Sequence, residues 1–207
     1  MNPAFSVHVG DVKGGSVPCT DKNLQKVRNE FNLFAQSLVF TPSDNDWTDC
    51  HRKKAGKFDP LERLARVRQM YFTPDRSLGA KLMPLLGQPG PIENSRWTEE
   101  NVVFTTIHMV GSNNGMERTP ASVGEYFSRN AANMEWIRAA FATTMANNTP
   151  AMVVAFQADP WWGTALVPTD MGLREHAQHP GPPRVRRLAG RCCSFTATRT
   201  CWSSTAR

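Results

Sequence analysis

The first forty residues alternate apolar and polar positions in a way that predicts a strand, a helix and a second strand. Phe5, Val7 and Val9 alternate with polar residues, as one face of a half-buried strand does. A helix is predicted from Thr20 or Asp21, because apolar residues then recur at three- and four-residue steps: Leu24, Val27, Phe31, Phe34 and Leu38. A short apolar strand at residues 38–40 follows. Strands joined by a helix form a parallel unit, so both end at the same edge of a sheet.

A carboxylate follows each of these two strands. Gly10 lets the backbone turn just before Asp11, and Asp44 comes shortly after the second strand. Open α/β sheets bind ligands at this edge, so we expect the two side chains to lie side by side there. Two neighbouring carboxylates repel each other, and a bound cation keeps both ionised. The alternative is that both acids simply begin loops.

The rest of the apolar pattern predicts one α/β domain without internal repeats. Asp59, Pro60 and Glu62 have the composition of a helix start. Residues 73–97 are rich in Pro and Gly and indicate a long surface excursion, which could lie over the site. Beyond it, the pattern predicts a strand at 102–108, a long helix at about 123–145 and a strand at 152–156.

At the two carboxylates the chain resembles the calcineurin-like metallophosphoesterases. The residues that carry the resemblance are Gly10-Asp11 and Ser43-Asp44-Asn45-Asp46, and the similarity runs from about residue 5 to about residue 163. It implies a sandwich of α-β-β-α layers, incomplete here, whose two divalent metal ions (Mn, Fe, Zn or Mg) hydrolyse a phosphoester. By this resemblance Asp11 bridges the metals and Asp44 binds one of them.

The chain departs from the family pattern at several positions of the site. Gly14 stands where the family has a second aspartate, and Asn45 stands at the position of the catalytic histidine. Asn45 is thus the candidate catalytic residue there, but asparagine cannot act as a general acid at neutral pH, so a leaving group would take its proton from water or from elsewhere. Gln157 occupies a place where the family more often has a histidine ligand, and Asp159 is the better metal ligand there, or else a turn or cap residue. We therefore expect an impaired hydrolase, the alternative being a non-catalytic binding protein whose metal centre is lost.

The strand end at His108 and the loop after it are further candidates. His108 either faces the crevice as a catalytic, phosphate-binding imidazole or is a structural residue with satisfied hydrogen bonds. The polar loop at 111–115 could bind an anion through its backbone N–H groups. Asn113 and Asn114 in that loop are candidate substrate-binding residues, with turn residues as the alternative.

The chain from residue 166 onward lacks the apolar periodicity of the domain at 1–165. It holds seven Arg, no Lys, one Asp and one Glu, and so carries +5 of the formal net charge of +6. When residues 187–205 are back-translated and read one nucleotide earlier, permissible third bases give an apolar strand followed by His-Gly-Asp-Thr-His, which resembles the family's last metal block. We therefore expect 166–207 to be an out-of-frame, disordered tail, the alternative being a natural Arg-rich disordered extension. Because the family's first metal block is absent, we expect a start that is either truncated or misassigned. No nucleic-acid module and no membrane segment is recognised, and the substrate of the phosphoesterase is not specified.

Cys19 and Cys50 each follow one of the two carboxylate loops. Because these loops share one sheet edge, the two thiols come within reach of a disulfide. A disulfide at this place indicates a periplasmic or secreted ancestor. Two free buried thiols in a cytoplasmic protein are the alternative.

Overall fold

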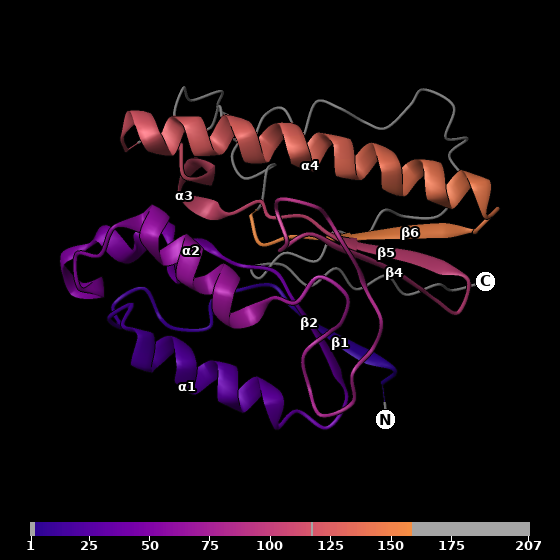
Figure 1. Cartoon of the computed structure of the whole chain (residues 1–207), viewed down its shortest axis with the longest axis horizontal. Coiled ribbons are helices and arrows are strands. Elements are labelled where there is room, and N and C mark those ends of the chain that lie inside the picture. The colour runs from indigo at the N-terminus through magenta and orange to yellow at the C-terminus, as the bar shows by residue number, and fades with distance from the viewer. Residues whose placement is uncertain (1–2, 117, 159–207) are drawn as a thin grey trace, which may run out of the picture.

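The computed structural model describes residues 3–116 and 118–158, and it begins with the predicted parallel strand-helix-strand unit (Figure 1). β1 (Phe5–His8) pairs in parallel with β2 (Ser37–Phe40), and α1 (Asp21–Asn32) connects them. Thr20 is the N-cap, since its side chain accepts a hydrogen bond from the Asn23 N–H at 3.2 Å. The prediction was wrong at the other end: the helix stops at Asn32, so Phe34 lies outside it and is 43% exposed.

A second, four-stranded sheet follows along the chain. Its order is β3 (Leu86–Gly87), β4 (Ser95–Glu99), β5 (Val102–Thr106) and β6 (Ala151–Ala155). β3, β4 and β5 are antiparallel neighbours, whereas β6 is parallel to β5 and is reached through the long helix α4 (Pro120–Ala146). The two predicted strands and the helix between them are confirmed to within a few residues. The excursion predicted at 73–97 is wrong in its last part, which contains β3 and β4.

The helices lie on both sides of the strands (Figure 1). α4 packs against β5 and β6, whereas α1 packs against α2 (Pro60–Tyr71). Asp59 caps α2 as predicted, by accepting a hydrogen bond from the Glu62 N–H at 2.8 Å. Short helices form the loops at the site: η1 (Asp44–Asp46), η2 (Thr48–His51), η3 (Lys53–Ala55) and α3 (Gly111–Asn114). The described part is thus a mixed α/β domain, and none of its helices is long and apolar enough to span a membrane.

Aromatic contacts join the two sheets. The Phe5 ring on β1 makes edge contacts with Trp97 and Phe104, at centroid distances of 5.2 and 4.9 Å. On the α1 side, Tyr71 is buried and donates its hydroxyl proton to the Leu24 carbonyl at 2.6 Å. Apolar packing therefore fixes β1 and β2 between the four-stranded sheet and the pair α1 and α2.

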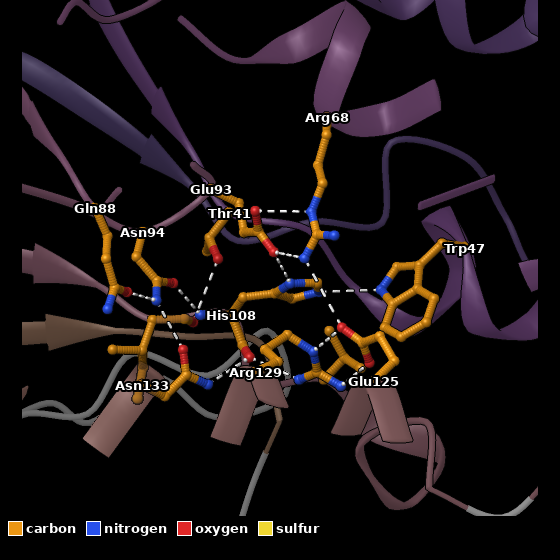
Figure 2. Close-up of polar contacts among 12 residues, drawn as sticks. Thr41, Trp47, Arg68, Gln88, Glu93, Asn94, His108, Glu125, Arg129 and Asn133 are labelled. Atoms are coloured by element: carbon orange, nitrogen blue, oxygen red, sulfur yellow. Dashed lines mark hydrogen bonds and ion pairs between the residues drawn. The ribbon is translucent and has the colours of Figure 1, made fainter. Parts of the chain in front are cut away.

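A buried carboxylate, Glu93, ties together elements that are far apart in the sequence (Figure 2). Arg68 of α2 donates to both carboxylate oxygens, at 3.0 and 2.6 Å. His108, just after β5, contacts the same carboxylate through Nδ1 at 2.7 Å. Burial alone raises the pKa of Glu93, but the hydrogen bonds from His108 and Arg68 outweigh it and hold the pKa well below its ordinary range. Glu93 is therefore ionised and fully paired.

The hydrogen bonds of His108 define its tautomer. The Trp47 indole N–H donates to Nε2 at 3.0 Å, and an indole nitrogen can only donate. Nε2 is therefore the acceptor, so Nδ1 carries the proton that is donated to Glu93. Burial lowers the pKa of His108, the nearby Arg129 charge lowers it further, and Glu93 offsets this only in part. The ring is thus a neutral link between Glu93 and Trp47.

We predict that Glu93→Gln lowers the free energy of unfolding by about 3 kcal/mol, because it removes the buried charge that pairs with Arg68 and accepts the His108 hydrogen bond. Urea denaturation monitored by tryptophan fluorescence measures the change. Glu100→Gln is the matched control: Glu100 is exposed, and a surface change of this kind stays within about 0.5 kcal/mol. Equal stabilities of Glu93→Gln and the control would contradict the role given to Glu93.

We also predict that His108 keeps its neutral Nδ1–H tautomer at about pH 6.5, where an ordinary histidine is half protonated, because burial lowers its pKa. A histidine whose pKa is lowered in the fold stabilises it above pH 6.5, and that contribution is lost as the pH falls. Nitrogen chemical shifts of ¹⁵N-labelled histidine measure the tautomer directly. An imidazolium spectrum for His108 at about pH 6.5 contradicts the prediction.

Candidate functional site

Asp11 and Asp44 lie together beyond the carboxyl ends of β1 and β2, and Asn45 connects them. The Asn45 side-chain amide donates to Asp11 Oδ1 at 2.9 Å, while its backbone N–H donates to Asp44 Oδ1 at 2.9 Å. The backbone N–H of Asp11 in turn donates to the Ser43 hydroxyl at 2.7 Å. The juxtaposition expected from the strand order is therefore confirmed.

Two glycines permit this close approach of loops. Gly10 has φ of +82°, and a Cβ there would lie 2.3 Å from the Ser43 Cβ. A Cβ at Gly111 would lie 2.5 Å from Asp44 Oδ2. Gly10 thus brings the β1 loop onto the β2 loop, and Gly111 brings the α3 loop onto Asp44.

Asp46 and Asp49 complete an acidic group, called here the carboxylate cluster: Asp11, Asp44, Asp46 and Asp49. Asp46 is fully buried, and its two oxygens accept hydrogen bonds from the Val12 N–H at 3.0 Å and the Ser43 N–H at 2.9 Å. Burial raises the pKa of Asp46 to about 7, although these donors oppose the shift. Asp49 forms an ion pair with Arg52 at 2.8 Å. These two carboxylates therefore have partners within the protein.

Asp44 is less well satisfied than its neighbours. Besides the adjacent Asn45 N–H, its carboxylate has, among residues 3–116 and 118–158, only long contacts, both at 3.4 Å, from the Gln157 amide and the Ser112 hydroxyl. The Ser112 hydroxyl has a single proton and lies closer to Asp49, at 3.0 Å. Burial raises the pKa of Asp44, and the charges of Asp49 and Asp11 raise it further. A cation beside Asp44 would relieve both penalties.

Lys13 follows Asp11 on the β1 loop, and its side chain is buried. Its side chain is 7% exposed, and within the described residues its ammonium nitrogen is buried without a hydrogen-bond partner. Burial lowers the pKa of Lys13, whereas the charges of all four carboxylates, with Asp46 the strongest, favour the ammonium form. Burial is the larger effect, so the pKa of Lys13 is lowered overall.

The structure corrects two of the predicted roles. His108 is wrong as a catalytic residue, because it is fully buried and both ring nitrogens are bonded to Glu93 and Trp47. Asn114 is wrong as a substrate ligand, because its side-chain oxygen accepts hydrogen bonds from the Val110 N–H and from Arg129. The alternative, a structural role for each, is the one the structure has.

The other predicted residues have mixed outcomes. Asn113 is buried and lies in a run of left-handed residues, Ser112 to Asn114, which agrees with the turn alternative. Gln157 does lie beside Asp44, but its oxygen accepts a hydrogen bond from the Gly111 N–H at 2.7 Å and so links two loops. Asp159 and the tail predicted to be out of frame lie outside the described residues.

The carboxylate oxygens of Asp11 and Asp44 suit a hard cation that keeps most of its waters better than a metal ion coordinated entirely by protein side chains. In the part of the chain that the structure describes, no three His, Cys, Asp or Glu side chains converge as a metal-binding group. Mg²⁺ typically needs only one or two carboxylates, because it keeps several waters and takes further oxygens from substrate phosphates. Asp11 and Asp44, with the poorly satisfied charge of Asp44, meet that smaller requirement. Of the expected metals, Mg²⁺ or Mn²⁺ suits these oxygen donors better than Zn²⁺.

Lys13, Asp46, Asp49 and Ser112 were not predicted as members of the site. Asp46 had a sequence signal, since Ser43 and Asp46 have capping-box spacing, and the structure forms that box. Lys13 and Ser112 had none, because a single polar residue in a loop shows no periodicity. Their place in the site depends on how the loops fold over one another.

A disulfide between Cys19 and Cys50 joins the segments that follow the two carboxylate loops. Their Cα atoms are 5.7 Å apart, both side chains are fully buried, and they pack with Ala55 and Phe58. The disulfide alternative is therefore the one that the structure bears out. A periplasmic or secreted location remains a prediction that the disulfide favours.

We predict that Cys50→Ser lowers the free energy of unfolding by about 3 to 4 kcal/mol, since the bridge closes a loop between residues 31 apart. Denaturation of the variant and of the oxidised and reduced parent protein measures the effect, with reduced parent and variant expected to agree. Thiol labelling of the unfolded, unreduced parent is the control. If Cys19 and Cys50 both react with the label, the bridge does not form.

Comparisons with known proteins give no relative for this chain. No family model matches it, and neither a curated protein nor a solved structure is similar to it.

Proposed function

We propose that this chain is a divalent-metal-dependent phosphoesterase of the calcineurin-like type, with the α-β-β-α sandwich that this type implies. The observation that carries the proposal is the pair Asp11 and Asp44, held together by Asn45 at the carboxyl edge of parallel strands, with Asp44 short of partners. This edge is where open α/β sheets bind ligands. The substrate class is a phosphoester.

The residues of the site have separate roles in this proposal. Asp11 and Asp44 hold the cation, and Asn45 orients Asp11 through its 2.9 Å hydrogen bond. When bound, a divalent cation polarises a phosphoryl oxygen and lowers the pKa of water. Asn45 can donate a hydrogen bond to the phosphoryl group but cannot protonate the leaving group. The leaving group therefore takes its proton from water, and we expect slow hydrolysis of esters with poor leaving groups.

A binding protein without catalysis is the second candidate. The observation that favours it is the absence of a three-ligand metal group among residues 3–116 and 118–158. Such a protein would bind a cation weakly and turn over no ester. Activity measurements with an activated ester, whose leaving group needs no proton, separate the two candidates.

We predict that the protein with Mn²⁺ hydrolyses bis(p-nitrophenyl) phosphate or p-nitrophenyl phosphate, and that Asp44→Asn and Asp11→Asn each lower kcat/KM by a hundred-fold or more. Each substitution removes a charge that holds the cation, and a loss of about 3 kcal/mol of transition-state stabilisation corresponds to that factor. Asp75→Asn is the matched control, since Asp75 is exposed on the surface.

Two results contradict the proposal. One is a rate that does not change when Mn²⁺ is removed by a chelator. The other is an equal loss of activity in Asp75→Asn and Asp44→Asn. Mn²⁺ binding without hydrolysis of either activated ester favours the binding protein instead.

A further inference from the structure

Positive charge is concentrated in one loop beside the candidate site. Residues 51–57, called here the basic loop, read His-Arg-Lys-Lys-Ala-Gly-Lys and contain no acidic residue. The chain has a formal net charge of +6, of which +5 belongs to residues 166–207, so the domain itself is almost neutral. A local excess of cations on a nearly neutral domain attracts an anionic ligand.

The backbone of the basic loop is held in place while its lysines face solvent. The buried Ala55 accepts a hydrogen bond from the Cys19 N–H at 2.9 Å, and the Phe58 N–H donates to the Cys50 carbonyl at 2.9 Å. Three lysine side chains are exposed, and within residues 3–116 and 118–158 none of them forms an ion pair or a hydrogen bond: Lys53, Lys54 and Lys57. A fixed loop with unpaired cations loses little backbone freedom when it binds an anion.

Arg52 connects the basic loop to the candidate cation site. Its guanidinium group forms an ion pair with Asp49 at 2.8 Å and donates to the Ser112 hydroxyl at 3.5 Å. That hydroxyl oxygen lies 3.4 Å from Asp44 Oδ2. The Arg52 side chain is 51% exposed, so part of its guanidinium fork stays open to a ligand. The basic loop therefore begins next to the place where a phosphoryl group on a cation beside Asp44 would lie.

We propose that the basic loop binds a second phosphate group of the substrate, so that the enzyme acts on small molecules that carry a phosphate besides the one that is hydrolysed. This inference rests on the proposed function, which supplies the neighbouring site of hydrolysis. The Arg52 guanidinium group can bind phosphate oxygens in pairs, and the lysines add point charges around them. The basic loop is thus a determinant of specificity.

The composition of the loop favours a small phosphorylated molecule over a nucleic acid. Single-stranded nucleic acids are bound by grooves that follow several phosphates and offer aromatic side chains to the bases. Residues 51–57 contain no Phe, Tyr or Trp, and seven residues folded into short helical turns span few phosphates. A nucleic acid is therefore an outcome of the test that would overturn the inference.

Binding of an inorganic polyphosphate tests the basic loop without any measurement of activity. We expect the whole, metal-free chain to bind tripolyphosphate more tightly than inorganic phosphate in isothermal titration, with shifts of the backbone amide signals of residues 51–57. The double variant Lys53→Gln, Lys54→Gln removes two cations, and we expect it to bind tripolyphosphate on the order of ten-fold more weakly.

Two matched double variants test whether these charges are the cause. Lys53→Arg, Lys54→Arg keeps both charges and is expected to bind as the parent does. Lys22→Gln, Lys81→Gln removes two charges at exposed lysines elsewhere and is also expected to bind as the parent does. Equal weakening in the two Gln variants overturns the inference. If Lys53→Gln, Lys54→Gln does not fold, as judged by near-ultraviolet circular dichroism, the parent decides: tripolyphosphate shifts at 51–57 support the inference, and their absence overturns it.

Substrate preference separates this inference from the proposed function. With Mn²⁺, we expect kcat/KM for fructose 1,6-bisphosphate to exceed that for fructose 6-phosphate on the order of ten-fold, and Lys53→Gln, Lys54→Gln to lose this preference. Hydrolysis without the preference and without tripolyphosphate binding overturns the inference alone. Tripolyphosphate binding at the basic loop without hydrolysis of any ester supports the phosphate-binding loop and contradicts only the phosphoesterase proposal. Binding of a single-stranded oligonucleotide far more tightly than tripolyphosphate, lost in the same variant, overturns the small-molecule assignment.

Discussion

The bidentate pairing of the buried Glu93 with Arg68 is the interaction on which the arrangement of the domain depends. Through it α2 is held against the segment that precedes β4, and through the second contact of Glu93 the end of β5 is held by His108. The Trp47 indole then bonds to the far side of the same imidazole ring. Because Trp47 directly follows η1, a chain of hydrogen bonds runs from Glu93 to the loop that carries Asp44.

Arg129 of α4 extends this network to the α3 loop, which contacts Asp44 from the other side of the site. It donates to the His108 carbonyl and to the carbonyl and side chain of Asn114, and its guanidinium group lies 5.3 Å from the Trp47 ring centroid. Asn114 is the last of the left-handed residues in α3, a conformation that costs roughly 1 to 2 kcal/mol per residue. The hydrogen bonds of Arg129 stabilise that turn. The loops of η1 and α3 are thus held by one buried cluster, and they meet at Asp44.

The sequence predicted those parts of the structure that depend on local patterns. The alternation at Phe5 to Val9, the helix face from Leu24 and the cap at Asp59 were visible because period and capping chemistry are local properties. The meeting of Asp11 with Asp44 followed from the rule that parallel strands end at one edge. Glu93 could not be predicted, because it lies in a stretch rich in Pro and Gly, where a polar residue indicates a loop. Its burial follows from partners in α2 and after β5, and no pattern within a short window contains them.

The same limit explains why His108 was open to two readings. A histidine at a strand end has the same local sequence whether it faces a crevice or the interior, and only Trp47 and Glu93, 61 and 15 residues away, decide between them. For Lys13, three of the four carboxylates that act on it electrostatically lie on the loop after β2, far from it in the sequence. Roles that depend on the meeting of loops are therefore those that sequence reasoning missed.

The network around Glu93 and the carboxylate cluster differ in how fully their polar groups are paired, and this difference bears on function. In the network around Glu93, the donors and acceptors are matched: the carboxylate, both ring nitrogens of His108 and the guanidinium of Arg129 all have partners. In the carboxylate cluster, by contrast, Asp44 has only long side-chain contacts within the described part of the chain. The Lys13 ammonium has no hydrogen-bond partner there either. Loose packing does not explain the difference, because a disulfide and two close-approach glycines hold those loops. Poorly paired charge in a rigid frame favours an external cation, and this is the physical basis of the cation site proposed beside Asp44.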